Sequence, residues 1–110
     1  MTLKEIIGKC NRLGVYDTRY FTDEYIELVF YNKEINEWNR VFADILGPAV
    51  KPPGAEPTED DLRLTKEFGG IWGNQTLFKK DFGDTTIISM FWPWQDNVHT
   101  TLKTVLFKKE

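Results

Sequence analysis

The stretch Thr85 to Phe107, TTIISMFWPWQDNVHTTLKTVLF, decides the fold because it contains two strand-like runs separated by a clear turn. Thr85 to Trp92 and Val98 to Phe107 are rich in β-branched and aromatic residues, whereas Pro93 to Asn97 is rich in residues that favour turns. Two such runs with a short connection predict an antiparallel hairpin. A third run, Thr76 to Lys80, precedes the hairpin across the turn sequence DFGD and extends it to a meander.

Helical patterns and one further strand make up the rest of the chain. The first 14 residues combine capping-box spacing with apolar residues at helical intervals. The same periodicity runs from Ile35 to Leu46 and ends in Gly-Pro, and Thr58 precedes a third helical pattern. Tyr25 to Tyr31, YIELVFY, is rich in aromatic and β-branched residues and predicts a strand. We therefore expect an α+β domain in which an antiparallel β-meander of three to four strands carries two or three helices packed on one face.

Length and composition predict one globular domain. A chain of 110 residues that is 41% apolar and 15% aromatic can bury a core without disulfides or metals. Residues 47–57, GPAVKPPGAEP, contain four prolines and two glycines, which are too many for a helix or a central strand. We expect residues 1–110 to form a single domain that includes a stiff, proline-rich connection at 47–57.

Charge and hydropathy argue against several classes of partner. The net charge of −3 offers no basic surface for nucleic acid. The longest mostly apolar run, Ile87 to Trp94, is far shorter than the ~20 residues that span a bilayer as a helix. The N-terminal residues lack the continuous hydrophobic stretch of a signal peptide, and the lone Cys10 cannot form an internal disulfide. We therefore expect a cytoplasmic protein with no membrane span and no nucleic-acid partner.

The parity of the hairpin sorts its side chains onto two faces. With a turn of five residues, Pro93 to Asn97, Trp92 lies opposite Val98 and Ser89 lies opposite Thr101. A turn with one residue more or fewer would exchange the two faces of the last strand. The face assigned to the core carries Ile88, Met90, Trp92, Val98, Leu102 and Leu106, and the other carries Ile87, Ser89, Phe91, His99, Thr101, Lys103, Val105 and Phe107.

The second of these faces, together with the turn, is the predicted binding site for a ligand or a partner. Its candidate residues are Ser89, Phe91, Trp94, His99, Thr101 and Lys103. In this register the hydroxyl groups of Ser89 and Thr101 form a row, and Lys103 supplies a charge for an anionic ligand. The same residues also fit a purely structural role, because cross-strand hydroxyl pairs stabilise sheets without any ligand.

The sequence predicts no catalytic residue, no metal site and no cofactor. His99 is the only histidine, which excludes a multi-histidine metal site. The diagonal from Ser89 to His99 would be about 7 Å, too long for a nucleophile in contact with its base. Asp81 and Asp84 flank a turn but lack the further oxygen ligands of a calcium-binding loop.

Trp94 connects the hairpin to a hypothesis about function. It lies in the turn, where the sheet cannot readily bury it. In order of preference, its ring packs on its own chain (a helix or the proline-rich connection), on a second subunit, on a ligand or on a membrane surface. The leading hypothesis is an interaction module, either homodimeric or bound to another protein. The alternative is a small-molecule-binding domain or enzyme that uses the polar and aromatic face, and a subunit of a larger assembly is a third.

Overall fold

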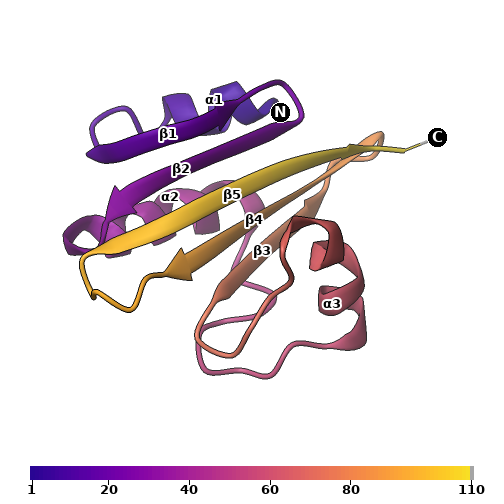
Figure 1. Ribbon diagram of the computed structural model, residues 1–110. Coiled ribbons are helices and arrows are strands. Elements are labelled where there is room, and N and C mark those ends of the chain that lie inside the picture. The colour runs from indigo at the N-terminus through magenta and orange to yellow at the C-terminus, as the bar shows by residue number, and fades with distance from the viewer. Residues whose placement is uncertain (110) are drawn as a thin grey trace.

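A five-stranded antiparallel sheet forms the centre of the computed structural model, which describes residues 1–109 (Figure 1). The strand order is β1-β2-β5-β4-β3, and each neighbouring pair is antiparallel. Short 3-10 turns follow β2 at Asn32–Glu34 and α3 at Lys66–Phe68. In chain order the elements are α1 Leu3–Gly8, β1 Val15–Phe21, β2 Tyr25–Tyr31, α2 Ile35–Leu46, α3 Glu59–Thr65, β3 Thr76–Asp81, β4 Thr85–Pro93 and β5 His99–Lys108.

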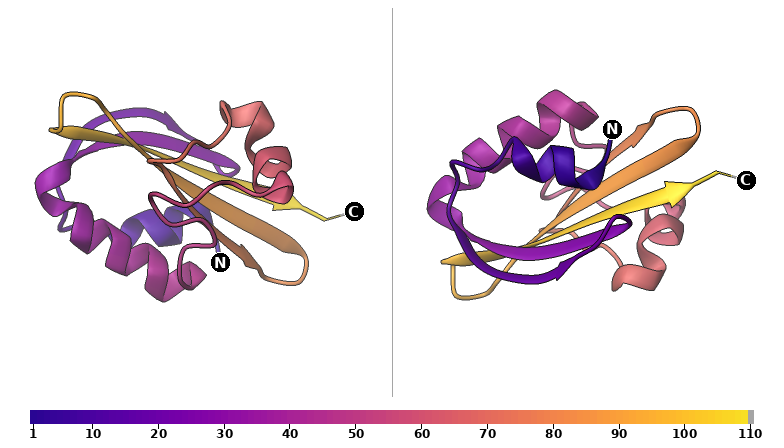
Figure 2. Two further views of the ribbon diagram at one scale, coloured as in Figure 1. Left: turned by 90° about the horizontal axis from the view of Figure 1, so that it is seen from below. Right: turned by 90° about the horizontal axis from the view of Figure 1, so that it is seen from above.

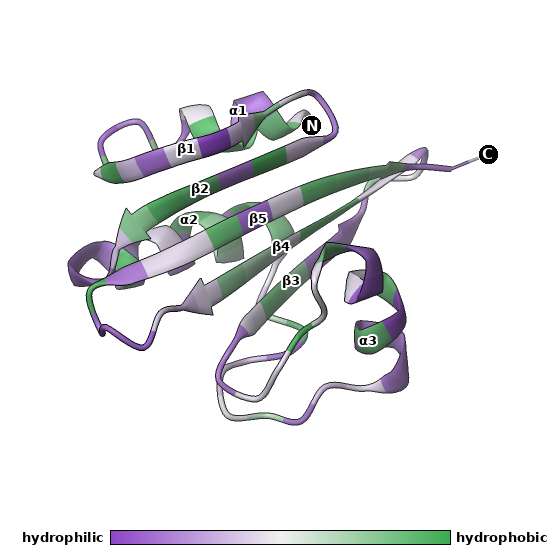
Figure 3. Cartoon of the chain, in the orientation of Figure 1, coloured by the Kyte–Doolittle hydropathy of each residue, from purple (hydrophilic) through white to green (hydrophobic). Residues whose placement is uncertain are grey.

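The α+β class and the antiparallel sheet are confirmed, but the sheet has five strands where the sequence predicts three to four. The additional strand is β1, VYDTRYF, which forms one edge of the sheet and is exposed along its whole length. Two bulges, at Val15/Asp17 and Thr18/Tyr20, interrupt its pairing with β2. A bulge shifts side chains relative to the sheet, so β1 lacks the simple alternation that marks a strand in sequence. Polar residues dominate the middle of β1 in Figure 3.

The helices lie on both faces of the sheet, which corrects the prediction that they pack on one face. Helices α1 and α2 cover one side, hereafter the helix face, and α3 lies on the opposite side, the far face, beside β3 and β4 (Figure 2). On the helix face the rings of Phe30 and Trp38 stack with their centroids 4.6 Å apart. On the far face Ile71, which follows α3, packs into a second cluster with Leu77 and Ile88. Because both faces are covered there, residues 76–78 of β3 and 87–91 of β4 are buried whichever face their side chains take.

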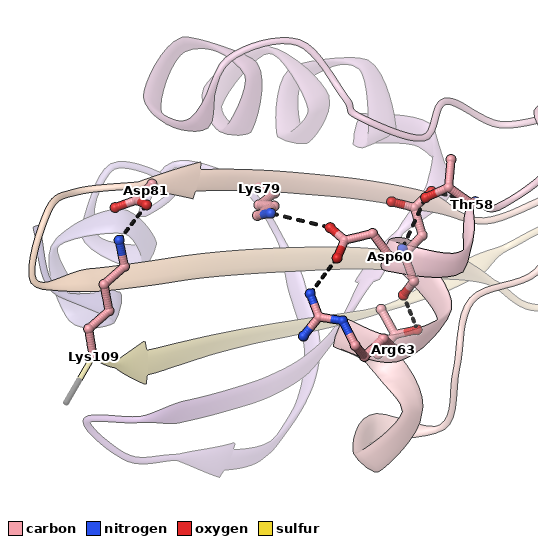
Figure 4. A network of polar contacts seen from close by, with 8 residues as sticks. Thr58, Asp60, Arg63, Lys79, Asp81 and Lys109 are labelled. Carbon is pink, nitrogen blue, oxygen red and sulfur yellow. Dashed lines mark hydrogen bonds and ion pairs between the residues drawn. The ribbon is translucent and has the colours of Figure 1, made fainter.

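Helix α3 is fixed to the sheet by its capped start and by charge. Thr58 and Asp61 form a capping box, as the acidic first turn predicts. Asp60 lies between Arg63 of the same helix and Lys79 of β3, whose ammonium is 3.5 Å from the carboxylate (Figure 4). These exposed ion pairs orient α3 more than they stabilise it, because surface pairs contribute roughly 0–1 kcal/mol.

The predicted register of the hairpin was wrong. Phe91 pairs with Leu102 and Trp92 pairs with Thr101, and the next closing contact joins the Trp94 amide to the carbonyl of His99 at 2.9 Å. The turn therefore contains four residues, 95–98, and this even number exchanges the faces of β5 relative to the prediction. The Asp96 carboxylate accepts hydrogen bonds from the amides of Val98 and His99 and closes this shorter turn.

The exchange of faces separates the predicted site residues. Ser89 and Phe91 lie on the helix face and are buried, at 0% and 2% exposure. The hydroxyl partner of Ser89 is Thr104, at 3.1 Å, and not Thr101. The core of the helix face contains Ile87 and Phe91, which the prediction placed outside the core, while Val98 is exposed in the turn.

Candidate functional site

Four of the six predicted site residues lie together on the far face, and two do not. Trp94 directly follows β4, and His99, Thr101 and Lys103 lie on β5, on the face opposite α1 and α2; Lys103 reaches the 3-10 turn after α3 at the carbonyl of Phe68. Ser89 and Phe91 point into the helix-face core. The far face over β1, β2 and β5 is therefore the candidate site.

Trp94 folds back onto this face. Its indole Nε1 donates a hydrogen bond to Thr101 Oγ1 at 2.7 Å, and its ring centroid lies 4.9 Å from that of His99. The Arg19 guanidinium is 5.6 Å from the same ring, a cation–π distance. The ring therefore packs on its own sheet, although not on a helix or the proline-rich connection, and it stays partly exposed.

An aromatic cluster, defined here as Tyr16, Tyr31, Trp94 and His99, spans three strands and the turn. Tyr31 and His99 are direct partners in the ladder between β2 and β5, with centroids 5.6 Å apart. Tyr16 occupies the first bulge of β1, and its ring lies 4.3 Å from His99 and 5.8 Å from Tyr31. The bulge thus directs Tyr16 onto the far face, where it is 52% exposed.

His99 is held in position by Asp96. The imidazole Nδ1 lies 2.6 Å from Asp96 Oδ2, and the His99 side chain is 16% exposed. The hydrogen bond from His99, together with those from the amides of Val98 and His99, lowers the pKa of the Asp96 carboxyl below its ordinary value. This arrangement orients an imidazole, as in many active sites, and the rings that contact the imidazole are those of Tyr16, Tyr31 and Trp94.

The Asp96 contact predicts a specific pH dependence. A carboxyl whose pKa is lower in the folded state contributes stability above its unfolded pKa, near 3.8, and loses that contribution as pH falls through the folded value. Asp96→Asn is therefore expected to be less stable than the wild type at pH 7 and equally stable in strong acid, as measured by urea unfolding. Asp23→Asn, which changes a carboxylate that is 88% exposed, is the control. A gap between wild type and Asp96→Asn that persists at the lowest pH would contradict the assignment.

The neighbouring polar groups are already engaged within the chain. The Lys103 ammonium lies 3.5 Å from the centroid of the Trp92 ring and donates to the carbonyl of Phe68 at 2.9 Å. Burial lowers the pKa of Lys103, and the nearby Glu27 carboxylate opposes this shift. Lys103 is thus held by contacts within the chain, while its side chain stays partly exposed.

The sequence interpretation missed the contribution of β1 to this site. Tyr16, Arg19 and Tyr20 all reach the far face, and Tyr20 lies 5.7 Å from Tyr25 between ring centroids. The clustering of tyrosine with arginine in YDTRY is the only signal that pointed there, because the strand itself has no alternation. Arginine and tyrosine are enriched at protein interfaces.

Other chemistries find little support in the described residues. Burial raises the pKa of the Cys10 thiol to about 11, which leaves it protonated and inert. Residues 1–109 bring together no group of three or more histidine, cysteine, aspartate or glutamate side chains that could hold a metal ion. Among the same residues every helix is too short or too polar to cross a bilayer.

Comparisons with protein-family models, curated proteins and solved structures found no match to this chain.

Proposed function

We propose that this protein is a small interaction module that binds a second copy of itself through strand β1 and the adjoining aromatic cluster. The observation that carries the proposal is the composition of the free edge. Of the nine large hydrophobic side chains that are exposed within residues 1–109, four belong to β1. Their exposed fractions are 42% for Val15, 52% for Tyr16, 57% for Tyr20 and 48% for Phe21.

An edge strand of this kind is suited to pairing with another strand. It presents backbone N–H and C=O groups that have no partner within its own sheet, and apolar side chains on it favour association. Natural edges are often protected by lysine or proline, and β1 contains neither. Its edge protection consists of the two bulges and of the charged side chains of Asp17 and Arg19.

A small-molecule site on the same face has weaker support. Ligand pockets usually enclose ~300–1,000 Å³ and bury most of the ligand. The hollow that adjoins the aromatic cluster at Tyr31 holds about 290 Å³ and is completed by Asn32, Lys33, Asn97 and Val98. The constellation of Ser89 with His99 and Thr101, on which this alternative depended, does not form because Ser89 lies on the opposite face.

The oligomeric state tests the proposal directly. We expect sedimentation equilibrium and native mass spectrometry to show a monomer–dimer equilibrium, because a contact of one strand edge is small and its affinity modest. Phe21→Ser, at an exposed position of β1, is expected to shift the equilibrium to monomer. Trp72→Ser is the matched control, since Trp72 is a still more exposed aromatic residue, at 64%, on a loop far along the chain from β1.

Two results would contradict the proposal. One is a wild-type protein that remains monomeric into the millimolar range. The other is a dimer that Trp72→Ser disrupts and Phe21→Ser leaves intact, which would move the interface to the loop after α3. Circular dichroism of each variant establishes that the fold is kept.

A further inference from the structure

Strand β1 is self-complementary about its central residue, Thr18. Moving outward from Thr18, the residues at equal distances are Asp17 and Arg19, then Tyr16 and Tyr20, then Val15 and Phe21. In an antiparallel pair of two identical strands centred on Thr18, these residues lie opposite one another. Each pair belongs to a class that stabilises antiparallel ladders: opposite charges, two aromatic rings, two apolar side chains, and threonine with threonine.

The orientation of the side chains has the same symmetry. Val15, Thr18 and Phe21 pair with β2 residues of the helix-face core, namely Phe30, Leu28 and Ile26. Between them, Tyr16, Arg19 and Tyr20 contact residues of the far face, and Asp17 lies 3.5 Å from Arg19. The two bulges, one on each side of Thr18, convert the usual alternation into a pattern in which every third residue faces the helices. This pattern reads the same in both directions.

From these observations we infer that two copies of the chain pair β1 with β1, antiparallel, about a two-fold axis at Thr18. The contact joins the two five-stranded sheets into one sheet of ten strands and is isologous, as a two-fold interface must be. The inference rests on the proposed function and names its partner surface and register. Asp17 of each copy then faces Arg19 of the other, and these two ion pairs lie on either side of the axis.

Charge and face together select this register over its neighbours. An axis at Asp17 would set the two Asp17 carboxylates opposite each other, and an axis at Arg19 would do the same for the two guanidinium groups. Like charges directly opposite are destabilising. Either shift would also pair Thr18, whose side chain faces the helices, with a tyrosine of the other copy whose side chain lies on the far face. Only the axis at Thr18 keeps the charges matched and the faces aligned.

Cysteine cross-linking tests the register. In a Cys10→Ser background, Thr18→Cys places two thiols across the axis, where directly opposed Cα atoms are about 4.5–5.5 Å apart and a disulfide can form. We expect mild oxidation to give a covalent dimer of Thr18→Cys. Asp17→Cys and Arg19→Cys are matched controls at adjacent exposed positions, and neither is expected to link to itself, because in this register like-numbered residues are offset along the strand.

Charge reversal supplies an independent test. Arg19→Asp would place the new carboxylate opposite Asp17 of the other copy, on both sides of the axis. We expect this repulsion to weaken the dimer at least about tenfold. The double exchange Asp17→Arg/Arg19→Asp restores opposite charges and is expected to recover most of the affinity. A dimer that self-links at Asp17→Cys or Arg19→Cys, or that ignores the charge reversal, would overturn this register while leaving self-association intact. A wild-type monomer at every concentration would overturn the proposed function and this inference together.

Discussion

Replacing Gly69 by alanine is expected to destabilise the protein by about 3 kcal/mol, the sum of two costs. Gly69 ends the turn after α3 with φ of +100°, a conformation that costs an L-residue roughly 1–2 kcal/mol. A Cβ there would also lie 2.3 Å from the tip of the Trp92 ring. Trp92 cannot move freely, because the Lys103 ammonium is held against its ring, and overpacking of this kind costs typically 1–3 kcal/mol.

The next residue provides the control for this prediction. Gly70 also has a positive φ, of +82°, but no atom lies within 4 Å of a Cβ built on it. Gly70→Ala is therefore expected to lose only the conformational part, about 1 kcal/mol. Urea unfolding monitored by tryptophan fluorescence measures both values. Equal losses for the two variants would show that the loop yields to the added methyl and that Trp92 is not fixed by its neighbours.

Replacing Lys51 by methionine is expected to cost about 2 kcal/mol, a large effect for one lysine in a segment that the sequence describes as a connection. Lys51 is only 1% exposed, and its ammonium donates to the carbonyls of Pro52, Gly73 and Gln75 at 3.2, 2.9 and 2.6 Å. Methionine fills a similar volume but donates to none of these carbonyls. The carbonyls of Pro52 and Gly73 keep the amides of Ala55 and Gly54 as donors, whereas the Gln75 carbonyl loses the donor it has in Lys51. An unsatisfied buried group costs ≈ 1–3 kcal/mol. Relief of the cost of burying a charge, which lowers the pKa of Lys51, offsets part of the loss.

Lys79→Met is the matched control for Lys51→Met. Lys79 lies on β3 with its side chain 35% exposed, and its one ion pair is the 3.5 Å contact with Asp60. The same chemical change there is expected to alter the free energy of unfolding by less than about 1 kcal/mol. If both lysines prove equally replaceable in urea unfolding, the Gln75 carbonyl must find water as a substitute donor.

The sequence predicted an element correctly where the spacing of its hydrophobic residues follows the ordinary period of a helix or a strand. Helix α2 and strands β2, β4 and β5 follow ordinary helical or strand periods, and their positions could be predicted. Strand β1 could not, because its two bulges place every third residue toward the core and no standard period describes that spacing. Helix α3 could be located but not assigned to a face, since hydrophobic spacing within a helix does not indicate the layer against which it packs.

The candidate site was predicted only in part, because one contact, between Trp94 and His99, sets the length of the turn. The sequence predicted a site that includes Trp94, His99, Thr101 and Lys103, and these four residues share the far face. It misplaced Ser89 and Phe91 because the contact between Trp94 and His99 shortens the turn to four residues, and turn length sets parity. The composition of the turn did not indicate that Pro93 and Trp94 would continue the pairing of β4 with β5 beyond Trp92.

The central position of β5 has a consequence for biosynthesis. β5 is the last strand in chain order, yet it lies between β2 and β4 and contributes Leu102 to one hydrophobic cluster and Val105 to the other. During translation the two hairpins β1–β2 and β3–β4 emerge first, each with an open inner edge. Neither cluster can close until the ribosome has delivered β5, so both layers of the fold are completed in one late step. Until then the inner edges of both hairpins stay unpaired, and unpaired edges of this kind are prone to pair with other chains.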